Sequence, residues 1–209
     1  MRRILLCLAL WAGAAAAAPP APPVILVMGD SLSAAFNLKP SEGWVALLDA
    51  RLRQGGYDYT VVNASISGET TSGGLARLPG TLVQHRPAIV ILELGANDGL
   101  RGTPIKAMRD DLERMIRLSR QAGAKVLLAG ILLPPNYGKA YAGEFSAVYA
   151  GLAMKYRLAF LPFLLEGVAE HRELLQPDGL HPLADAEPRV LDNVWARLEP
   201  LLQKRASPK

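Results

Sequence analysis

Five short apolar segments, separated from one another by helical patterns, constrain the fold of this chain more than any other feature. The segments are VILVM, YTVVNAS, AIVILEL, KVLLAGIL and LAFLP, at residues 24–28, 59–65, 88–94, 125–132 and 158–162. AIVILEL is apolar on both faces, which is typical of a strand in a parallel sheet that helices cover on both sides. Strands that alternate with helices predict an α/β fold with an open, five-stranded parallel sheet.

The segments between the strands carry apolar residues at helical spacing. Gly55-Gly56 ends the first such pattern, whose apolar members are Trp44, Val45, Leu47, Leu48 and Leu52. Further helices are predicted at about residues 72–84, 104–121, 140–156 and 186–202. The chain shows no internal repeat and no internal change of composition, so residues 24–203 are predicted to form one domain.

The first 18 residues have the pattern of a targeting segment rather than of a folded element. Arg2 and Arg3 precede an apolar, alanine-rich stretch over residues 4–18, which is typical of a cleaved signal peptide. Cleavage is expected near Ala16–Ala18, ahead of a Pro-rich linker over residues 19–23. The apolar core is too short for a stable membrane anchor, so we expect a periplasmic or secreted protein.

Composition argues against several classes of function. The only cysteine, Cys7, lies in the predicted signal peptide, so the mature chain is expected to have no disulfide and no thiolate metal site. The three histidines are dispersed, and we expect neither a metal nor a cofactor. Basic residues are interleaved with acidic ones, as in MRDDLERMIRLSRQ, which indicates a solvated helix face and no nucleic-acid partner. We expect a monomer, because no surplus apolar face stands out.

Polar residues follow four of the predicted strands, at ends that a parallel sheet gathers along one edge. They are Gly29-Asp30-Ser31, the stretch 63–68, Gly95-Ala96-Asn97-Asp98, and the stretch 177–182 after the fifth strand. Open α/β sheets bind their ligands at this edge. The sequence therefore predicts that a serine, an imidazole and carboxylates meet at one site.

An alcohol becomes a nucleophile only when a base lies within hydrogen-bond reach and a third group orients that base. His85 is expected at the opposite edge of the sheet, and His171 lies in a charged surface stretch, so His181 is the remaining candidate for the base of Ser31. Asp178 lies three residues earlier and can orient His181. Each motif also has a structural interpretation, as a helix cap or an Asp-Gly turn, but their coincidence at one edge favours a catalytic triad.

Acyl transfer also needs hydrogen-bond donors for the developing oxyanion. The candidates are the backbone N–H groups of Ser31 and Gly68 and the side-chain amide of Asn97, although Gly68 and Asn97 also occur in stretches typical of turns. Asp30 adjoins Ser31 but is predicted to cap the turn or hold neighbouring loops, rather than to act in the triad. Glu93, within the third strand, is expected to bond with loop backbone and is assigned no chemistry.

Four blocks of the sequence together resemble the four blocks of the SGNH (GDSL) hydrolase family. They are GDSLS, NASISGET, GAND and DGLHP, which contain Ser31, Gly68, Asn97, Asp178 and His181. LPPNYG and YAGEFSAVY are further similar to a bacterial periplasmic branch of thioesterases, lysophospholipases and arylesterases, and the resemblance covers nearly the whole predicted mature chain.

The resemblance implies a flavodoxin-like three-layer α/β/α fold in which Ser31 is the nucleophile, His181 the base and Asp178 its orienting acid. Ser31, Gly68 and Asn97 would form the oxyanion hole. The loop after the fourth strand would bind the acyl chain through Leu133, Pro134, Pro135, Asn136 and Tyr137.

The expected activity is hydrolysis of small acyl esters or thioesters, of the arylesterase, acyl-CoA thioesterase or lysophospholipase type. Two alternatives remain open. One is a carbohydrate O-deacetylase of the same family, and the other is a non-catalytic lipid- or glycan-binding module on the same fold.

Overall fold

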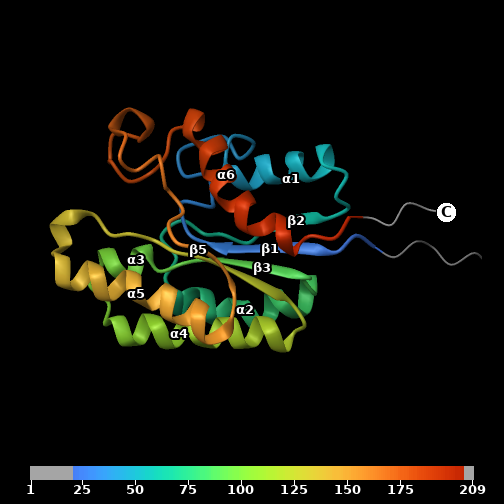
Figure 1. The fold of residues 1–209 in the computed structure, drawn as a ribbon, viewed down its shortest axis with the longest axis horizontal. Coiled ribbons are helices and arrows are strands. Elements are labelled where there is room, and N and C mark those ends of the chain that lie inside the picture. The colour runs from blue at the N-terminus through green and yellow to red at the C-terminus, as the bar shows by residue number, and fades with distance from the viewer. Residues whose placement is uncertain (1–20, 205–209) are drawn as a thin grey trace, which may run out of the picture.

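The structure is a computed structural model that describes residues 21–204 (Figure 1). The predicted signal peptide over residues 1–18 lies outside the described residues. Within residues 21–204, no helix is both long and apolar enough to cross a membrane. Residues 21–23, the described part of the predicted linker, have no regular structure and are exposed before the first strand begins.

The core of the molecule is one sheet of five parallel strands. In spatial order β2-β1-β3-β4-β5, every neighbouring pair is parallel. The strands are β1 (Val24–Gly29), β2 (Thr60–Asn63), β3 (Ile89–Glu93), β4 (Lys125–Ala129) and β5 (Ala159–Leu161). The predicted fold class is confirmed. The strands β2 and β4 end earlier than predicted, because residues 64–65 and 130–132 already belong to the loops at the carboxyl edge.

Helices cover both faces of the sheet, which gives three layers (Figure 1). One face carries α1 (Trp44–Gln54) and α6 (Glu187–Leu198), and the other carries α2 (Thr71–His85), α4 (Ile105–Gln121) and α5 (Lys139–Tyr156). The short helix α3 (Ala96–Leu100) lies at the carboxyl edge. Short 3₁₀ turns occupy Pro135–Tyr137, Arg172–Leu174, Ala184–Ala186 and Glu199–Leu201.

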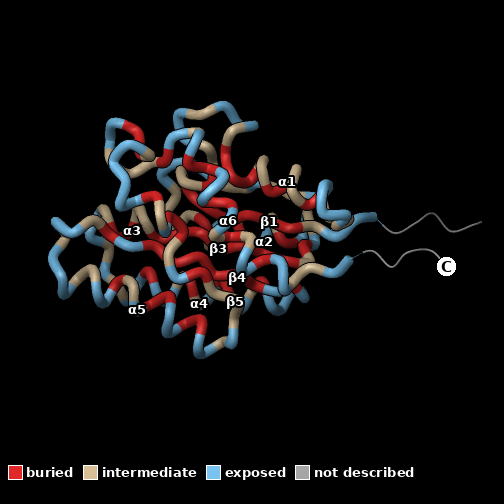
Figure 2. The backbone as a smooth tube through the Cα atoms, turned by 45° about the horizontal axis from the view of Figure 1, so that its top comes forward, coloured by how far each residue is buried: buried red, intermediate tan, exposed pale blue. Residues whose placement is uncertain are grey.

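The alternation of side chains along each strand fills both layers of core. In β1, Ile25 and Val27 pack toward α1 and α6, whereas Leu26 and Met28 pack toward α2, α4 and α5. All four are completely buried, and Figure 2 shows the same burial along the central strands. Each such side chain contributes about 1.5–3 kcal/mol by leaving water, so the apolar strands position the carboxyl edge rigidly.

Two further elements differ from the sequence prediction. The last helix was predicted over 186–202, but α6 ends at Leu198 and a 3₁₀ turn follows. Pro200 has no N–H to continue the helical hydrogen bonds. The Asn97-Asp98-Gly99 stretch is helical rather than a simple turn. Asp98 accepts hydrogen bonds from the N–H and hydroxyl of Thr71, at 2.8 and 2.7 Å, and these anchor α3 to α2.

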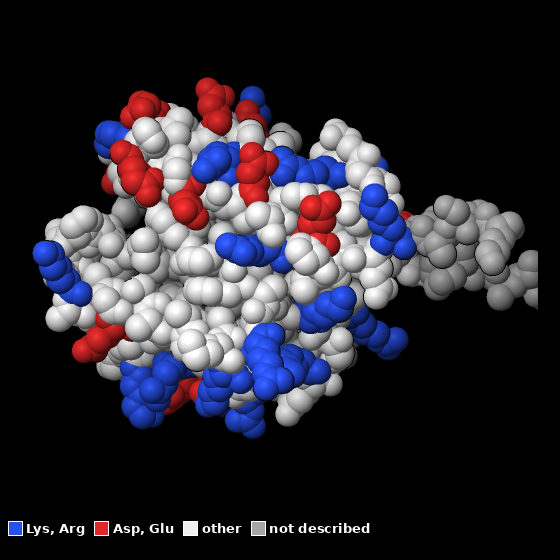
Figure 3. All heavy atoms as spheres, viewed as in Figure 1, with Lys and Arg blue, Asp and Glu red and all other residues white. Residues whose placement is uncertain are grey.

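The charged stretch at residues 108–121 lies on α4, as the sequence pattern predicts. Its buried apolar face includes Leu112 and Met115, and its opposite face is charged. Lys and Arg side chains gather over the lower helices in Figure 3, on the side of α4. Several are paired with acidic neighbours, for example Lys106 with Asp110 at 2.5 Å, so this face is a mixed, solvated surface.

Candidate active site

Ser31 lies in the first turn after β1, at the carboxyl edge of the sheet. The carbonyl of Asp30 accepts hydrogen bonds from the N–H groups of Ser33 and Ala34, at 3.3 and 2.9 Å, so the chain turns sharply as it leaves the strand. Gly29 must lack a side chain, because a Cβ there would lie 2.7 Å from a carboxyl oxygen of Glu93. The GDS motif thus presents the hydroxyl of Ser31 to the cavity at this edge.

The structure brings Ser31, His181 and Asp178 into one hydrogen-bonded series, although Ser31 and His181 are 150 positions apart. His181 Nε2 lies 2.8 Å from Ser31 Oγ, and His181 Nδ1 lies 2.7 Å from Asp178 Oδ2. A carboxylate can only accept, so Nδ1 carries the proton and Nε2 is left to accept from the serine hydroxyl. This is the tautomer that a general base for Ser31 requires.

Asp178 is held in its charged form by its own loop. Burial is the largest single influence and works to raise its pKa, but the N–H of Leu180 and the ring and N–H of His181 together hold the pKa below its usual range. The N–H groups of Leu180 and His181 reach Oδ1 at 2.9 and 3.1 Å. The carboxylate therefore stays ionised at neutral pH, where it can stabilise a protonated imidazole.

The other two histidines lie away from this series. His85 is in the last turn of α2, before β3 begins, and His171 is exposed and pairs with Glu173 at 3.3 Å. His181, the histidine predicted from the sequence to serve Ser31, is thus the one that the structure places beside it. One contact that sequence reasoning missed is the ring of Phe36, which packs against the His181 ring with the centroids 4.5 Å apart.

The three predicted oxyanion donors differ in their availability. Within residues 21–204, the backbone N–H groups of Ser31 and Gly68 have no hydrogen-bond acceptor, so both are free to donate to a ligand. Gly68 has a φ of +79°, which favours glycine at this position. The amide nitrogen of Asn97, in contrast, already donates to Asp30 Oδ2 at 3.2 Å and to the carbonyl of Glu69 at 3.0 Å. Asn97 must give up one of these bonds to hold an oxyanion.

Two buried carboxyl groups lie beneath the nucleophile. Asp30 accepts from the N–H of Leu32 at 3.0 Å as well as from Asn97, which agrees with its predicted role of holding the turn and neighbouring loops. Glu93 Oε2 accepts from the N–H of Asp30 at 3.3 Å and from the hydroxyl of Ser33 at 2.6 Å. The bond to the N–H of Asp30 agrees with the predicted role of Glu93 as a partner of loop backbone, whereas its bond to the hydroxyl of Ser33 was not predicted.

The two carboxyl groups differ in charge. Burial raises the pKa of Asp30 to about 6, so Asp30 is mainly ionised at neutral pH. Burial, together with the nearby charge of Asp30, raises the pKa of Glu93 well above its usual value. Glu93 is therefore the neutral partner, and Asp30 carries the negative charge that orients the amide of Asn97.

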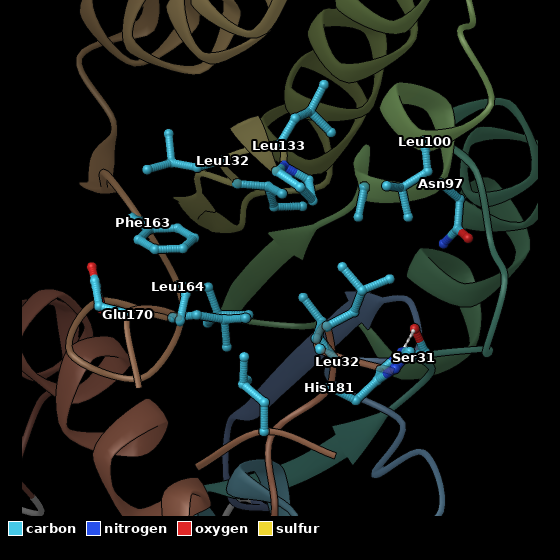
Figure 4. Close-up of a pocket in the computed structure, with 18 of the residues that line it drawn as sticks. Ser31, Leu32, Asn97, Leu100, Leu132, Leu133, Phe163, Leu164, Glu170 and His181 are labelled. Carbon is cyan, nitrogen blue, oxygen red and sulfur yellow. Dashed lines mark hydrogen bonds between the residues drawn. The ribbon is translucent and has the colours of Figure 1, made fainter. Parts of the chain in front are cut away.

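An apolar cavity of about 470 Å³ opens beside Ser31 and His181 (Figure 4). Of the predicted acyl-binding residues, Leu133, Pro134 and Pro135 line it. Asn136 and Tyr137 do not, because the 3₁₀ turn points the Tyr137 hydroxyl toward the carbonyl of Leu100, at 3.2 Å. A role of these two side chains in acyl binding therefore stays a prediction.

The segment after β5 supplies a wall of the cavity that sequence reasoning missed. Its contributions are Phe163, Leu164, Leu165, Ala169, Glu170 and Leu175. The signal was the apolar run LPFLLEGVA, which continues beyond the end of the fifth strand. Figure 4 shows Glu170 at the far end of the cavity from Ser31. Among residues 21–204, it is the only acidic or basic side chain in the lining besides His181.

A parallel α/β sheet with a hydrogen-bonded Ser–His–Asp series at its carboxyl edge, beside an apolar cavity, has the architecture of a serine-dependent hydrolase. The chain belongs to the GDSL-like lipase/acylhydrolase family, whose model matches residues 27–186. This confirms the family resemblance found in the sequence.

Three characterised relatives are similar to the chain over most of their length. Esterase TesA of Pseudomonas aeruginosa is 54% identical over 178 residues, which span 85% of this chain and 89% of that relative. An arylesterase of Vibrio mimicus is 46% identical over 174 residues, or 83% of this chain and 87% of the relative. Thioesterase 1/protease 1/lysophospholipase L1 of Escherichia coli is 43% identical over 178 residues, or 85% and 84%.

Solved structures agree with the fold. The crystal structure of TesA superposes with a TM-score of 0.84 at 54% identity and covers 86% of this chain and 99% of its own. The psychrotrophic esterase EstA from a Pseudoalteromonas species, inhibited by monoethylphosphonate, gives a TM-score of 0.81 at 39% identity, with coverage of 85% and 97%.

Proposed function

We propose that the chain is a serine hydrolase that cleaves carboxylic esters and thioesters through an acyl-enzyme. The observation that carries the proposal is the series Ser31–His181–Asp178, with contacts of 2.8 and 2.7 Å, at one end of an apolar cavity. The relatives named esterase, arylesterase and thioesterase 1/protease 1/lysophospholipase L1 support the same class of reaction.

In the acylation step, Ser31 Oγ attacks the acyl carbonyl carbon while its proton passes to His181 Nε2. The ionised Asp178 stabilises the resulting imidazolium through Nδ1. The N–H groups of Ser31 and Gly68 receive the oxyanion, and Asn97 joins them when it releases Asp30 or the carbonyl of Glu69. His181 then gives its proton to the departing alcohol or thiol, and the acyl group remains on Ser31.

In the deacylation step, His181 takes a proton from water, and the hydroxide so formed attacks the acyl carbon. The second tetrahedral intermediate collapses, His181 returns the proton to Ser31, and the carboxylic acid leaves. Base catalysis of this kind contributes about 10²–10⁴-fold to the rate. One well-placed oxyanion donor contributes about 10²–10³-fold.

The cavity supports acyl esters with an apolar chain as substrates. Its lining beyond the reaction end is formed mainly by leucine, isoleucine, proline and phenylalanine side chains. Such a lining suits the acyl chain of an aryl ester, an acyl thioester or a lysophospholipid. An acetylated sugar would need polar partners there, and a pure binding module would not need the Ser31–His181 contact.

The experiment is hydrolysis of a p-nitrophenyl ester series from acetate to palmitate by the wild type, Ser31→Ala and His181→Ala. Activity that is highest on medium or long chains and is lost in both variants is the expected result. Activity confined to acetate would favour the deacetylase. No activity in a folded wild type, together with no labelling by a fluorophosphonate, would favour the binding module.

The proposal extends to location. An Arg-Arg pair before the apolar stretch over residues 4–18 supports export to the periplasm or beyond, with cleavage near Ala16–Ala18. The mature enzyme would act as a monomer on small-molecule esters. The intact mass and N-terminal sequence of protein recovered from cell fractions test the cleavage, and light scattering tests the monomer.

A further inference from the structure

Ser31 and His181 come from two different loops, so the geometry of their contact depends on how these loops are held together. We refer to residues 30–38 as the nucleophile loop and to residues 175–183 as the histidine loop. The reacting groups touch at a single point, the 2.8 Å contact between Ser31 Oγ and His181 Nε2. The packing of Phe36 against the His181 ring is the second side-chain contact between the loops at this point.

Gln176 belongs to the histidine loop, and its side-chain amide joins this loop to the nucleophile loop. Its Nε2 donates to the carbonyl of Phe36 and to the carbonyl of Pro182, each at 2.9 Å. Its Oε1 accepts from Asn37 Nδ2 at 3.4 Å, and its backbone N–H donates to the carbonyl of His181 at 2.7 Å. The residue is only 6% exposed, so both amide protons are committed to carbonyls that water does not reach easily.

The nucleophile loop needs such a contact to keep its shape. Ala35 and Asn37 have φ values of +57° and +56°, in the left-handed region that non-glycine residues rarely adopt. Backbone of this kind persists only when surrounding contacts enforce it. The carbonyl that Gln176 holds belongs to Phe36, which lies between these two residues.

Gln176 itself is anchored on its other side. The guanidinium of Arg172 donates to the carbonyls of Leu175, Gln176 and Pro177, at 3.3, 2.6 and 2.6 Å. The carbonyl of Gln176 also accepts from the N–H of Gly179 at 2.9 Å. These bonds fix the backbone from which the side-chain amide of Gln176 reaches the nucleophile loop.

We propose that Gln176 is a positioning residue for the reaction: its amide fixes the nucleophile loop against the histidine loop and so sets the contact between Ser31 and His181. The inference rests on the proposed function, because this contact matters only if Ser31 attacks. Gln176 is not part of the cavity lining and touches neither the hydroxyl of Ser31 nor the imidazole ring. It therefore acts through backbone carbonyls and not on the substrate.

The kinetic signature follows from this placement. A displacement of about 1 Å between a nucleophile and its base can lower the rate about 100-fold, while the apolar cavity that binds the acyl chain is unchanged. Loss of the amide should therefore lower kcat by about 10- to 100-fold and leave KM within about twofold. The rate of phosphonylation of Ser31 by a fluorophosphonate should fall in parallel.

The experiment compares the full-length mature enzyme with three variants of this contact. Gln176→Met keeps the length of the side chain but removes both donors, and Gln176→Glu keeps an acceptor for Asn37 while its ionised form cannot donate. Asn37→Gly is the mild variant, because glycine tolerates the left-handed backbone and only the 3.4 Å bond is lost. We expect Asn37→Gly to lower kcat about two- to fivefold.

Asn193→Ala is the matched control. Its Nδ2 also joins two backbone carbonyls, those of Leu164 and Glu166, at 3.0 and 2.8 Å, but neither belongs to the nucleophile or histidine loop. Each variant is assayed well below its own Tm, so that only folded enzyme is compared. The control should lower Tm by a similar amount and leave kcat within twofold of the wild type.

The possible outcomes separate the inference from the proposed function. A lower kcat and a slower phosphonylation in the Gln176 variants, with KM and the control unchanged, support it. Gln176 variants whose Tm falls while kcat is unchanged, or whose KM rises at unchanged kcat, overturn it. If the Gln176 variants do not fold, an Asn37→Gly enzyme with wild-type kcat overturns it. A wild type that neither hydrolyses esters nor reacts with the phosphonate overturns the proposed function instead.

Discussion

The two ends of the cavity are built on different principles. At the reaction end, polar side chains are fixed by specific hydrogen bonds: His181 by Asp178, and Asn97 by Asp30 and the carbonyl of Glu69. At the distal end, the walls are apolar side chains from the segments after β4 and β5, which make no hydrogen bonds of their own. The exposed Glu170 is the one charged side chain that the described part of the chain contributes there (Figure 4).

This difference determines how strongly a substitution at each end of the cavity changes the reaction rate. The contribution of hydrogen-bonded catalytic groups to the rate depends on distances and angles. Removing one atom at the reaction end therefore has a large effect on the rate. Apolar walls depend on volume and contact area, so a change at the distal end has a graded effect that depends on the substrate. The following expectations, from the largest to the smallest, test this contrast.

The largest effect is expected at the acid of the series. Asp178→Asn keeps the size of the side chain but offers an amide that can donate to His181 Nδ1, which favours the wrong tautomer for a base. The kcat on p-nitrophenyl butyrate should fall about 10³–10⁴-fold with little loss of Tm. Asp185→Asn, in the 3₁₀ turn after the histidine loop, serves as the control and should retain activity. A fall of less than tenfold in Asp178→Asn would mean that another group orients His181.

The second-largest effect is expected at Asn97, the predicted oxyanion donor whose amide already donates two hydrogen bonds. Asn97→Ala should lower kcat about 10²–10³-fold if the amide turns to the substrate during the reaction. Steady-state kinetics on the same ester, with Tm measured in parallel, give the answer. A loss below fivefold would show that Asn97 keeps its bonds to Asp30 and Glu69, and that the two backbone N–H groups suffice.

A third expectation concerns the buried carboxyl pair at the reaction end. The folded-state pKa of Glu93 is raised by burial and by Asp30, so its contribution to stability is fully present below its unfolded value of about 4.5. That contribution is lost as the pH rises toward the folded pKa, by up to about 1.4 kcal/mol per pH unit. Glu93→Gln does not titrate and should escape this loss.

Urea unfolding of the wild type and Glu93→Gln at pH 5, 6, 7 and 8 provides the measurement. Altered hydrogen bonds shift the unfolding free energy of Glu93→Gln by an amount that does not depend on pH. The informative quantity is therefore how the difference in unfolding free energy between the two proteins changes with pH. This difference should move in favour of Glu93→Gln as the pH rises. A difference that does not change with pH would mean that Glu93 is ionised in the folded enzyme, contrary to its burial.

The smallest effect is expected at the distal end. Glu170→Leu removes the charged group from this part of the lining, so a long acyl chain no longer displaces water from a carboxylate. The ratio of kcat/KM for p-nitrophenyl laurate to that for acetate should rise about three- to tenfold, a change of about 1 kcal/mol. Glu166→Leu, in the same segment but outside the lining, is the control. An unchanged ratio would place the acyl chain elsewhere.

The same contrast explains how much the sequence could predict. The five strands and the polar residues at their carboxyl ends could be predicted, because apolar runs and short motifs are local signals. Ser31, Asp178 and His181 came together in the structure because one sheet edge gathers the loops that carry them. The bond between Gln176 and the carbonyl of Phe36 joins residues 140 positions apart, and no local sequence pattern indicates it.

The distal end was predicted less well for a physical reason. An apolar residue in a loop can face a cavity or the core, and the sequence does not distinguish the two. Tyr137, which was predicted to bind the acyl chain, packs over the core, whereas Phe163 and Leu164, which were not singled out, line the cavity. The motif LPPNYG was informative about the presence of a loop, but the direction of each side chain depends on the 3₁₀ turn at Pro135–Tyr137.

The most direct test of the account is to identify the residue that a fluorophosphonate modifies. The wild type, Ser31→Ala and His181→Ala would be treated with the reagent, and the adduct located by tandem mass spectrometry of their peptides. We predict a single adduct on Ser31 in the wild type, none in Ser31→Ala, and a rate of labelling in His181→Ala that is lower by at least about 100-fold. An adduct on another residue, or equal labelling of Ser31 without His181, would contradict it.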